Sequence, residues 1–213
     1  MLADDNGNSA FSSLARFSDV LRLRNGQPLV VRFIVPQDGE ELQSYFKTLT
    51  QRSRYNRFMG AASELPPAEL DTALHSGRQS RFAVVAEVKA GDVATIVGEA
   101  RYSYDAATRE VEFGLSVADD WQQQGVGSQL LANLECRAAA LGALRMFGET
   151  FRNNEQMIGL AKKSSFGFDP APHDWRLVRF SKTLPSAAED IPCENWKRAA
   201  VTGSLAEALV EVR

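Results

Sequence analysis

Runs of alternating and β-branched apolar residues recur along the chain and predict six strands. The strands cover Leu29–Val35, Arg81–Val88, Thr95–Tyr104, Glu110–Val117, Leu144–Phe151 and Arg176–Leu184. Short polar turns join the second, third and fourth of these runs. Because connections this short favour antiparallel neighbours, we expect the three strands to form a meander.

Apolar residues at helical spacing predict four helices between the strands. The first begins near Pro36, the second spans Pro67–His75, and the fourth begins at Asn153 or Asn154, either of which can cap it. The third follows Glu110–Val117 and carries Val126, Leu130, Leu131, Leu134, Ala138 and Leu141 on its apolar face. The order β-α-α-β-β-β-α-β-α-β predicts an α/β (α+β) fold, in which helices flank a mixed, mostly antiparallel sheet.

The regular spacing of apolar residues weakens at both ends of the sequence, which divides the chain into three parts. Residues 1–27 are an N-terminal extension with one expected short helix, and Asn25-Gly26 marks a turn at its end. Residues 28–184 are the single predicted domain. Residues 185–213 are a C-terminal tail, in which Ser204 is expected to cap a short amphipathic helix. This helix would dock on the domain or mediate a homodimer.

Composition narrows the class of protein. The 213 residues are 44% hydrophobic with a formal net charge of −3, so a basic surface for nucleic acid is not expected. No apolar run approaches the ~20 residues of a membrane span, and the polar N-terminus is a poor secretion signal, which favours a cytoplasmic protein. The two cysteines, Cys136 and Cys193, are not expected to form a disulfide framework, and no His/Cys cluster predicts a metal site.

The junction after Glu110–Val117 carries the most specific chemistry. There a strand runs into the glycine loop QQQGVG, residues 122–127, which opens a helix. The N–H groups of such a helix start attract anions, above all a diphosphate. A Walker A loop would need a lysine after Gly127, and a dinucleotide loop would need a glycine where Leu130 stands. The spacing instead satisfies Gln/Arg-x-x-Gly-x-Gly/Ala, the diphosphate loop for acyl-CoA.

Three segments in the same order resemble the GNAT superfamily of acyl-CoA-dependent N-acetyltransferases, in particular its bacterial protein-acetyltransferase branch. The first contains SRYNRF, residues 53–58; the second is VEFGLSVADDWQQQGVGSQLL; the third is NNEQMIGLAKKSSFGF. The resemblance covers roughly residues 28–184 and implies the GNAT fold. It further implies that the chain transfers the acetyl group of acetyl-CoA to a primary amine, of a small molecule or a protein lysine, by direct attack in a ternary complex. No metal is implied.

The resemblance also assigns residues to the donor site, chiefly through main-chain groups. These are Val117, Gln122, Gln123, Gln124, Gly125, Val126, Gly127, Ser128 and Asn154. The alternative for the glycines is a tight turn without a ligand, and for Asn154 it is a helix cap alone. Lys162 and Lys163 are candidates for the 3′-phosphate of CoA, although a solvated helix face explains them as well.

Catalysis of this kind needs a base that takes a proton from the amine. Glu112 is the candidate, because it shares a strand face with small Gly114 and Ser116 and matches a glutamate of the resembled branch; Glu149 is the runner-up. An exposed strand carboxylate is the alternative for both. The chain departs from the family at Ala161, where many members carry a tyrosine acid. A second hypothesis is therefore a non-catalytic acyl-CoA-binding sensor. A third is a small-metabolite or antibiotic acetyltransferase, which differs from a protein-lysine enzyme only in its acceptor cleft.

Overall fold

The computed structural model describes residues 17–60, 62–76, 80–91 and 93–203, and eight of its strands form one sheet. The strands are β1 (Asp19–Arg22), β2 (Pro28–Phe33), β3 (Arg81–Ala90), β4 (Val93–Asp105), β5 (Glu110–Val117), β6 (Arg145–Phe151), β7 (Gly167–Pro170) and β8 (Leu177–Thr183). They lie in the order β1-β2-β3-β4-β5-β6-β8-β7, and β5 and β6 are the parallel pair in it. The predicted mixed, mostly antiparallel sheet is confirmed.

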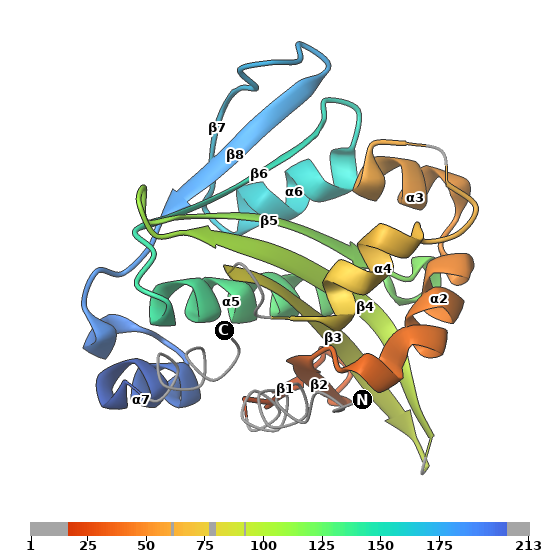
Figure 1. Ribbon diagram of the computed structural model, residues 1–213, viewed down its shortest axis with the longest axis horizontal. Helices are drawn as coiled ribbons and strands as arrows, with labels where there is room; N and C mark the ends of the chain where they lie inside the picture. Colours follow the sequence, from red (N-terminus) through yellow and green to blue (C-terminus); the bar gives the residue numbers. More distant parts are fainter. Residues whose placement is uncertain (1–16, 61, 77–79, 92, 204–213) are drawn as a thin grey trace, which may run out of the picture.

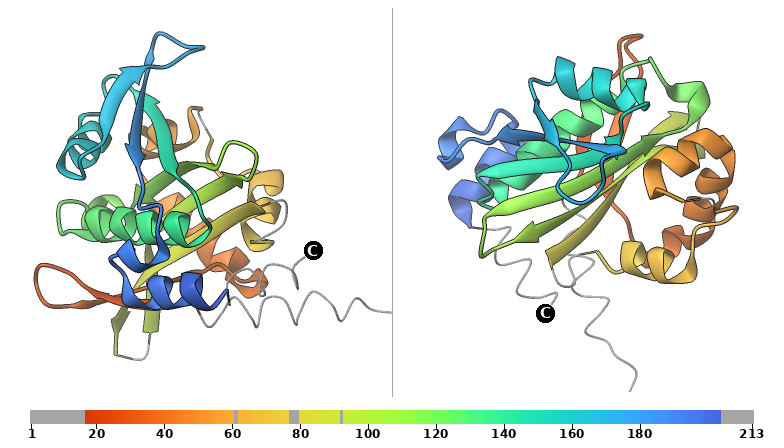
Figure 2. Two further views of the ribbon diagram at one scale, coloured as in Figure 1. Left: turned by 90° about the vertical axis from the view of Figure 1, so that its left-hand side faces the viewer. Right: turned by 90° about the horizontal axis from the view of Figure 1, so that it is seen from above.

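Six helices of the described residues flank this sheet: α2 (Gly39–Thr48), α3 (Gln51–Phe58), α4 (Pro67–Leu74), α5 (Val126–Ala140), α6 (Glu155–Lys163) and α7 (Glu194–Thr202). Helices α2 and α4 cover one face, and α5 and α7 lie against the other (Figures 1 and 2). Each face has its own core. Leu42 and Phe46 of α2 are buried in the first, and Leu130 and Leu131 of α5 are buried in the second. These are apolar positions that helical spacing predicted.

In its described residues the N-terminal extension forms a strand, and the rest of the expected short helix falls outside them. Its residues 1–16 lie outside the described part, but Asp19–Arg22 form β1, which pairs with β2 in a hairpin. The Asn25-Gly26 turn is present, and Gly26 has a φ of +84°, a conformation that glycine adopts without steric cost. The segment forms a strand because the hairpin lets Leu23 enter the core beside Leu29. Residues before position 28 therefore belong to the sheet.

Three further elements were not predicted: α3, the short edge strand β7, and α7 in the C-terminal tail. Helix α7 is fixed by Trp196, which is 1% exposed and donates from Nε1 to Asp19 at 2.8 Å. The terminal helix expected after Ser204 lies outside the described residues.

The sequence analysis did not predict a bond between the two cysteines, but Cys136 of α5 and Cys193 form a disulfide. Cys193 is the residue directly before α7, so the bond ties the start of this helix to α5. The part of the chain that the structure describes contains no free cysteine.

Candidate functional site

The centre of the sheet opens into a wedge between β5 and β6. Their parallel pairing consists of Glu110 with Arg145, Val111 with Met146, and Glu112 with Phe147, after which the two strands diverge (Figure 1). Gly148 lies where they part. A Cβ atom there would lie 2.7 Å from the Phe180 ring and 2.9 Å from the Phe113 carbonyl oxygen. Glycine is therefore required at the narrow end of the wedge.

The divergence leaves backbone groups of β5 facing the wedge. The N–H of Ala118 donates to Val97 of β4, on the other side of the strand. Because backbone groups alternate sides along a strand, the N–H and C=O groups of Leu115 and Val117 point into the wedge. One of them has a partner already, because Nε2 of Gln122 donates to the Val117 carbonyl at 3.1 Å. The others are positioned to bind an extended chain with amide groups.

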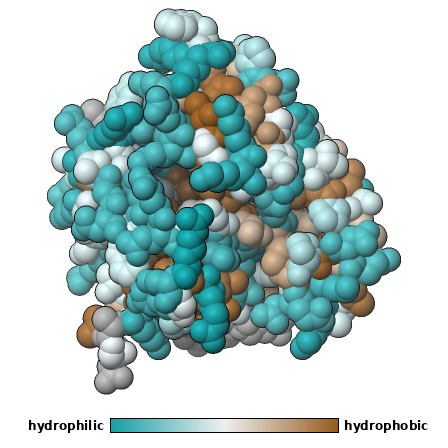
Figure 3. All heavy atoms as spheres, turned by 180° about the vertical axis from the view of Figure 1, so that it is seen from behind, coloured by the Kyte–Doolittle hydropathy of each residue, from teal (hydrophilic) through white to brown (hydrophobic). Residues whose placement is uncertain are grey.

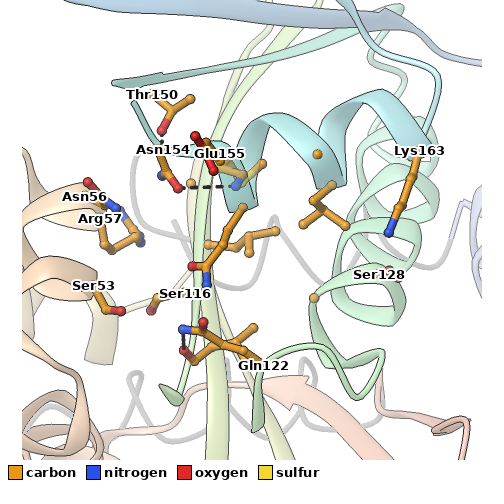
Figure 4. A pocket seen from close by; sticks show the side chains of 18 of the residues that line it. Ser53, Asn56, Arg57, Ser116, Gln122, Ser128, Thr150, Asn154, Glu155 and Lys163 are labelled. Atoms are coloured by element: carbon orange, nitrogen blue, oxygen red, sulfur yellow. Dashed lines mark hydrogen bonds between the residues drawn. The ribbon is translucent and has the colours of Figure 1, made fainter. Parts of the chain in front are cut away.

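A cavity of about 530 Å³ fills the wedge. This volume is within the range of small-molecule sites. Figure 4 shows it running from Arg57 and Asn56 of α3, past Ser116, to Ser128 of α5 and Lys163 of α6. Seen from behind, hydrophilic residues cover much of the molecule, with hydrophobic patches exposed among them (Figure 3).

At one end of the cavity, the glycine loop presents the start of α5. Gly125 has a φ of +100° and provides no side-chain cap for the helix. The N–H groups of the next three residues consequently have no partner within the helix. Gln122 and Gln124 use their side chains to hold the loop itself, the latter by donating to the Asp120 carbonyl at 2.7 Å. The free N–H groups and the positive end of the helix dipole form a site suited to a diphosphate.

Asn154 stands above the wedge and is held by two hydrogen bonds. Its side-chain oxygen accepts from the N–H of Met157 at 3.2 Å and caps α6, and its Nδ2 donates to Thr150 at 2.8 Å. The predicted cap is therefore present, and the same side chain also lines the cavity. Thr150 orients the amide, so that Asn154 has a fixed position beside the ligand path.

Sequence reasoning missed a buried polar group at the other end of the cavity. Glu99 of β4 is 1% exposed; it accepts from Nε of Arg57 at 2.8 Å, from Arg101 at 3.3 Å and from Ser116 at 3.1 Å. Tyr45 of α2 shares a further hydrogen bond with Ser116 at 2.9 Å. The signal in the sequence was the pair Glu99 and Arg101, two charges at strand spacing in an otherwise apolar run.

This group is held ionised. Burial raises the pKa of Glu99, but the charges of Arg57 and Arg101 outweigh it and place the pKa below its ordinary value. Burial raises the pKa of Tyr45, and the nearby Glu99 carboxylate raises it further, so the phenol stays protonated. Glu99 is therefore a fixed anion that holds Arg57 at the cavity wall and is poorly suited to accept a proton. The Arg57 guanidinium covers Gly114, where a Cβ would lie 3.0 Å from it.

The two carboxylates predicted as bases lie on the same sheet face as Arg57. Glu112 is exposed and does not line the cavity, because it belongs to the paired part of β5. Glu149 lies two residues beyond the last pair on β6 and does line it. Arg179 donates to the Glu149 carboxylate from Nε at 2.9 Å and from Nη2 at 2.8 Å.

The structure thus brings together most of the residues predicted for the donor site. Those that line the cavity are Val117, Gln122, Gln123, Gly125, Gly127, Ser128 and Asn154. Gln124 does not line it, and Val126 is buried in the core under α5. Ala161 is also fully buried in that core, and no tyrosine lines the cavity among the described residues.

Two further features bear on the class of protein. Within residues 17–203, apart from the short gaps named above, no group of His, Cys, Asp and Glu side chains is arranged to hold a metal ion. None of the helices described here has the length and apolar character needed to cross a membrane.

Comparison with known proteins agrees with this geometry. The chain is 27% identical over 167 residues to Acetyltransferase PA5475 of Pseudomonas aeruginosa, covering 78% of this chain and 90% of that protein. Its fold is similar to the GNAT domain of S. lividans PAT, with a TM-score of 0.72 and 24% identity over 80% of this chain and 98% of the other. Mycobacterium smegmatis RimJ, solved in complex with CoA-disulfide, has a TM-score of 0.59 and 16% identity, over 88% of this chain and 94% of RimJ. A model of the acetyltransferase (GNAT) family matches residues 46–168, more than half of the sequence, and the chain therefore belongs to this family.

Proposed function

We propose that this protein transfers the acetyl group of acetyl-CoA to a primary amine by direct attack in a ternary complex. The observation that carries the proposal is the wedge between β5 and β6, with the free N–H groups of α5 at one end and Arg57 and Glu149 at the other. A diphosphate at the loop would direct the pantetheine arm along Leu115 and Val117. The thioester would then lie near Asn154, and the acceptor would enter past α3.

The chemistry requires one bond to form and one to break. The amine nitrogen attacks the thioester carbonyl carbon and gives up a proton to water, the C–S bond breaks, and CoA leaves as a thiolate that takes a proton from water. Both cysteines of the chain are in the disulfide, so neither is free to carry the acetyl group. An oxyanion on the carbonyl needs a hydrogen-bond donor, and the β5 N–H groups in the wedge are suited to this role.

For the base we favour Glu149 over Glu112, since Glu149 lines the cavity and Glu112 does not. Glu149 would accept the proton of the incoming ammonium, directly or through one water molecule. Arg179 would hold the carboxylate in place.

Steady-state release of CoA thiol, measured with a panel of amines and lysine peptides, tests both the activity and the base. We expect Glu149→Gln to lower kcat by about 10²–10⁴-fold, which is typical of losing a general base, and Glu112→Gln to change it by less than about threefold. Loss of turnover in Glu112→Gln alone would instead return the base role to Glu112.

A second candidate function is an acyl-CoA-binding sensor without turnover. The observation that favours it is the burial of Ala161 together with the lack of a tyrosine among the described residues of the cavity wall, so a tyrosine acid is missing there. Calorimetric binding of acetyl-CoA without thiol release for any acceptor would support this sensor. Turnover with any amine would exclude it.

A further inference from the structure

The proposed donor site has a shortage of positive charge in its own loop. Residues 122–128 read QQQGVGS and contain no cation, and the two residues before Trp121 are Asp119 and Asp120. Asp119 accepts hydrogen bonds from Thr50 and Ser53, which hold its side chain at the loop. The backbone N–H groups supply only partial charges. Cations from other parts of the chain would add full positive charges to a diphosphate bound here.

The hairpin between β1 and β2 supplies one. The side chain of Arg24 lines the cavity and runs alongside Gly125, where an added Cβ would lie 3.5 Å from its Cγ and 4.0 Å from its Nε. Arg24 is exposed, and its guanidinium forms no ion pair with a residue of the described ranges. The charge is thus available to a ligand at the loop.

The two residues before this arginine are held in place by hydrogen bonds and burial. Leu23 is buried in the core, and its N–H donates to the Gln27 carbonyl at 2.9 Å across the turn. Nε2 of Gln129, in the first turns of α5, donates to the Arg22 carbonyl at 3.1 Å. Figure 2 shows the hairpin projecting beside one end of α5. The hairpin is therefore fixed to the helix whose N-terminus forms the anion site.

A second cation faces the loop from the opposite wall. Lys163, the last residue of α6, lines the cavity and extends toward Ser128 (Figure 4). Lys162, its neighbour, lies over the Phe168 ring at 6.0 Å and does not line the cavity. Of the two lysines, only Lys163 is thus placed to meet a phosphate of the same ligand.

We propose that Arg24 binds the diphosphate of the acyl-CoA donor, with Lys163 on the opposite side of the loop, so that residues before the predicted start of the domain complete the donor site. The inference rests on the proposed function, since it assumes an acyl-CoA donor. It makes the site selective for acyl thioesters that carry phosphates.

Calorimetry with acetyl-CoA on the full chain tests this assignment. Arg24→Gln should weaken binding about tenfold or more, the usual effect of losing one charge-assisted hydrogen bond to phosphate. Arg22→Gln is the matched control, because Arg22 belongs to the same hairpin but donates to the Gly26 carbonyl and does not line the cavity. It should bind acetyl-CoA within about twofold of wild type, which is the effect of an exposed charge without a partner at the site.

Dephospho-CoA, which keeps the diphosphate but lacks the 3′-phosphate, locates the contact. The Arg24→Gln loss should persist with this ligand, whereas S-acetylpantetheine, which has no phosphate, should bind both proteins equally. Equal binding of acetyl-CoA by wild type and Arg24→Gln, or an equal loss in Arg22→Gln, would overturn the inference while leaving the proposed function intact. Loss of the Arg24 effect with dephospho-CoA would overturn the assignment to the diphosphate. If wild type bound no acetyl-CoA, the proposed function itself would fail, and the inference with it.

Discussion

At the scale of single residues, Glu99 both stabilises the folded protein and holds Arg57 at the wall of the cavity. The Glu99 side chain is 2% exposed and pairs with Arg57 and Arg101. Glu99→Gln would leave two guanidinium groups without their buried counter-charge, so we expect it to lower the free energy of unfolding by about 3–5 kcal/mol. Glu69→Gln is the control: Glu69 also pairs with Arg101, but its side chain is 55% exposed, and the loss should stay below about 1 kcal/mol. Urea unfolding measures both, and similar small losses would contradict a structural role for Glu99.

The same residue predicts a loss of stability in acid. Because the folded-state pKa of Glu99 is lowered, its contribution is complete above the ordinary glutamate value of 4.5 and is lost as the pH falls through the folded-state pKa. The unfolded chain takes up this proton first, which favours unfolding. Urea unfolding of wild type and Glu99→Gln between pH 7 and pH 3 should show the two stabilities converging as the pH falls. Parallel curves would show that Glu99 does not have a lowered pKa.

At the scale of elements, Gly148 determines where β5 and β6 part. Its missing Cβ would meet the Phe180 ring and the Phe113 carbonyl, so Gly148→Ala must push the strands apart. We expect a loss of about 1–3 kcal/mol in unfolding free energy, as for overpacking of a core, with weaker acetyl-CoA binding. Gly167→Ala in edge strand β7 is the matched control, because the nearest atom to its Cβ is a carbonyl oxygen at 3.8 Å. Unchanged binding and stability in Gly148→Ala would refute this account of the wedge.

The disulfide that ties α7 to α5 predicts how reduction changes the stability of the protein. It closes a loop with a sequence separation of 57 residues, and its loss should cost about 2–4 kcal/mol of stability. Thermal unfolding with and without dithiothreitol should therefore show a lower midpoint in reductant, whereas the double variant Cys136→Ala/Cys193→Ala should not respond to it. Acetyl-CoA binding should persist after reduction, since Cys136 lies beyond the first two turns of α5, away from the loop. A midpoint that complete reduction does not change would argue against the bond.

How far the sequence predicts the structure differs between elements. The bounds of β5 were predicted as Glu110–Val117, because alternation and flanking turns both mark them. The four residues of β1 are too few for a periodic signal, and they form a strand only through pairing with β2. The disulfide depends on where α7 packs, which the spacing of two cysteines does not determine. The alternation of apolar and polar residues along β5 predicted that Glu112 shares a face with Gly114 and Ser116. This alternation does not predict where β5 separates from β6.

At the scale of the whole molecule, the candidate site draws on segments from most of the chain. Arg24 belongs to the N-terminal hairpin, Arg57 to α3, Gly125 to the loop, and Glu149 to β6. They line one cavity because the parallel pair β5 and β6 of the described sheet opens at its centre. The sequence motif predicted a loop and an asparagine, Asn154, most of whose residues line the cavity, because both are marked by local sequence. The proposed contribution of Arg24 and the position of Glu99 at the cavity depend on strand pairing across the sheet, which the local sequence around them does not determine.

We propose that an acyl-CoA donor occupies the wedge between β5 and β6. A crystal structure of the protein with acetyl-CoA tests it most directly. We expect the diphosphate against the N–H groups at the start of α5 and beside Arg24, with the pantetheine amides hydrogen-bonded to Leu115 and Val117. Acetyl-CoA bound elsewhere on the protein, or an empty wedge at a saturating concentration of the ligand, would contradict it.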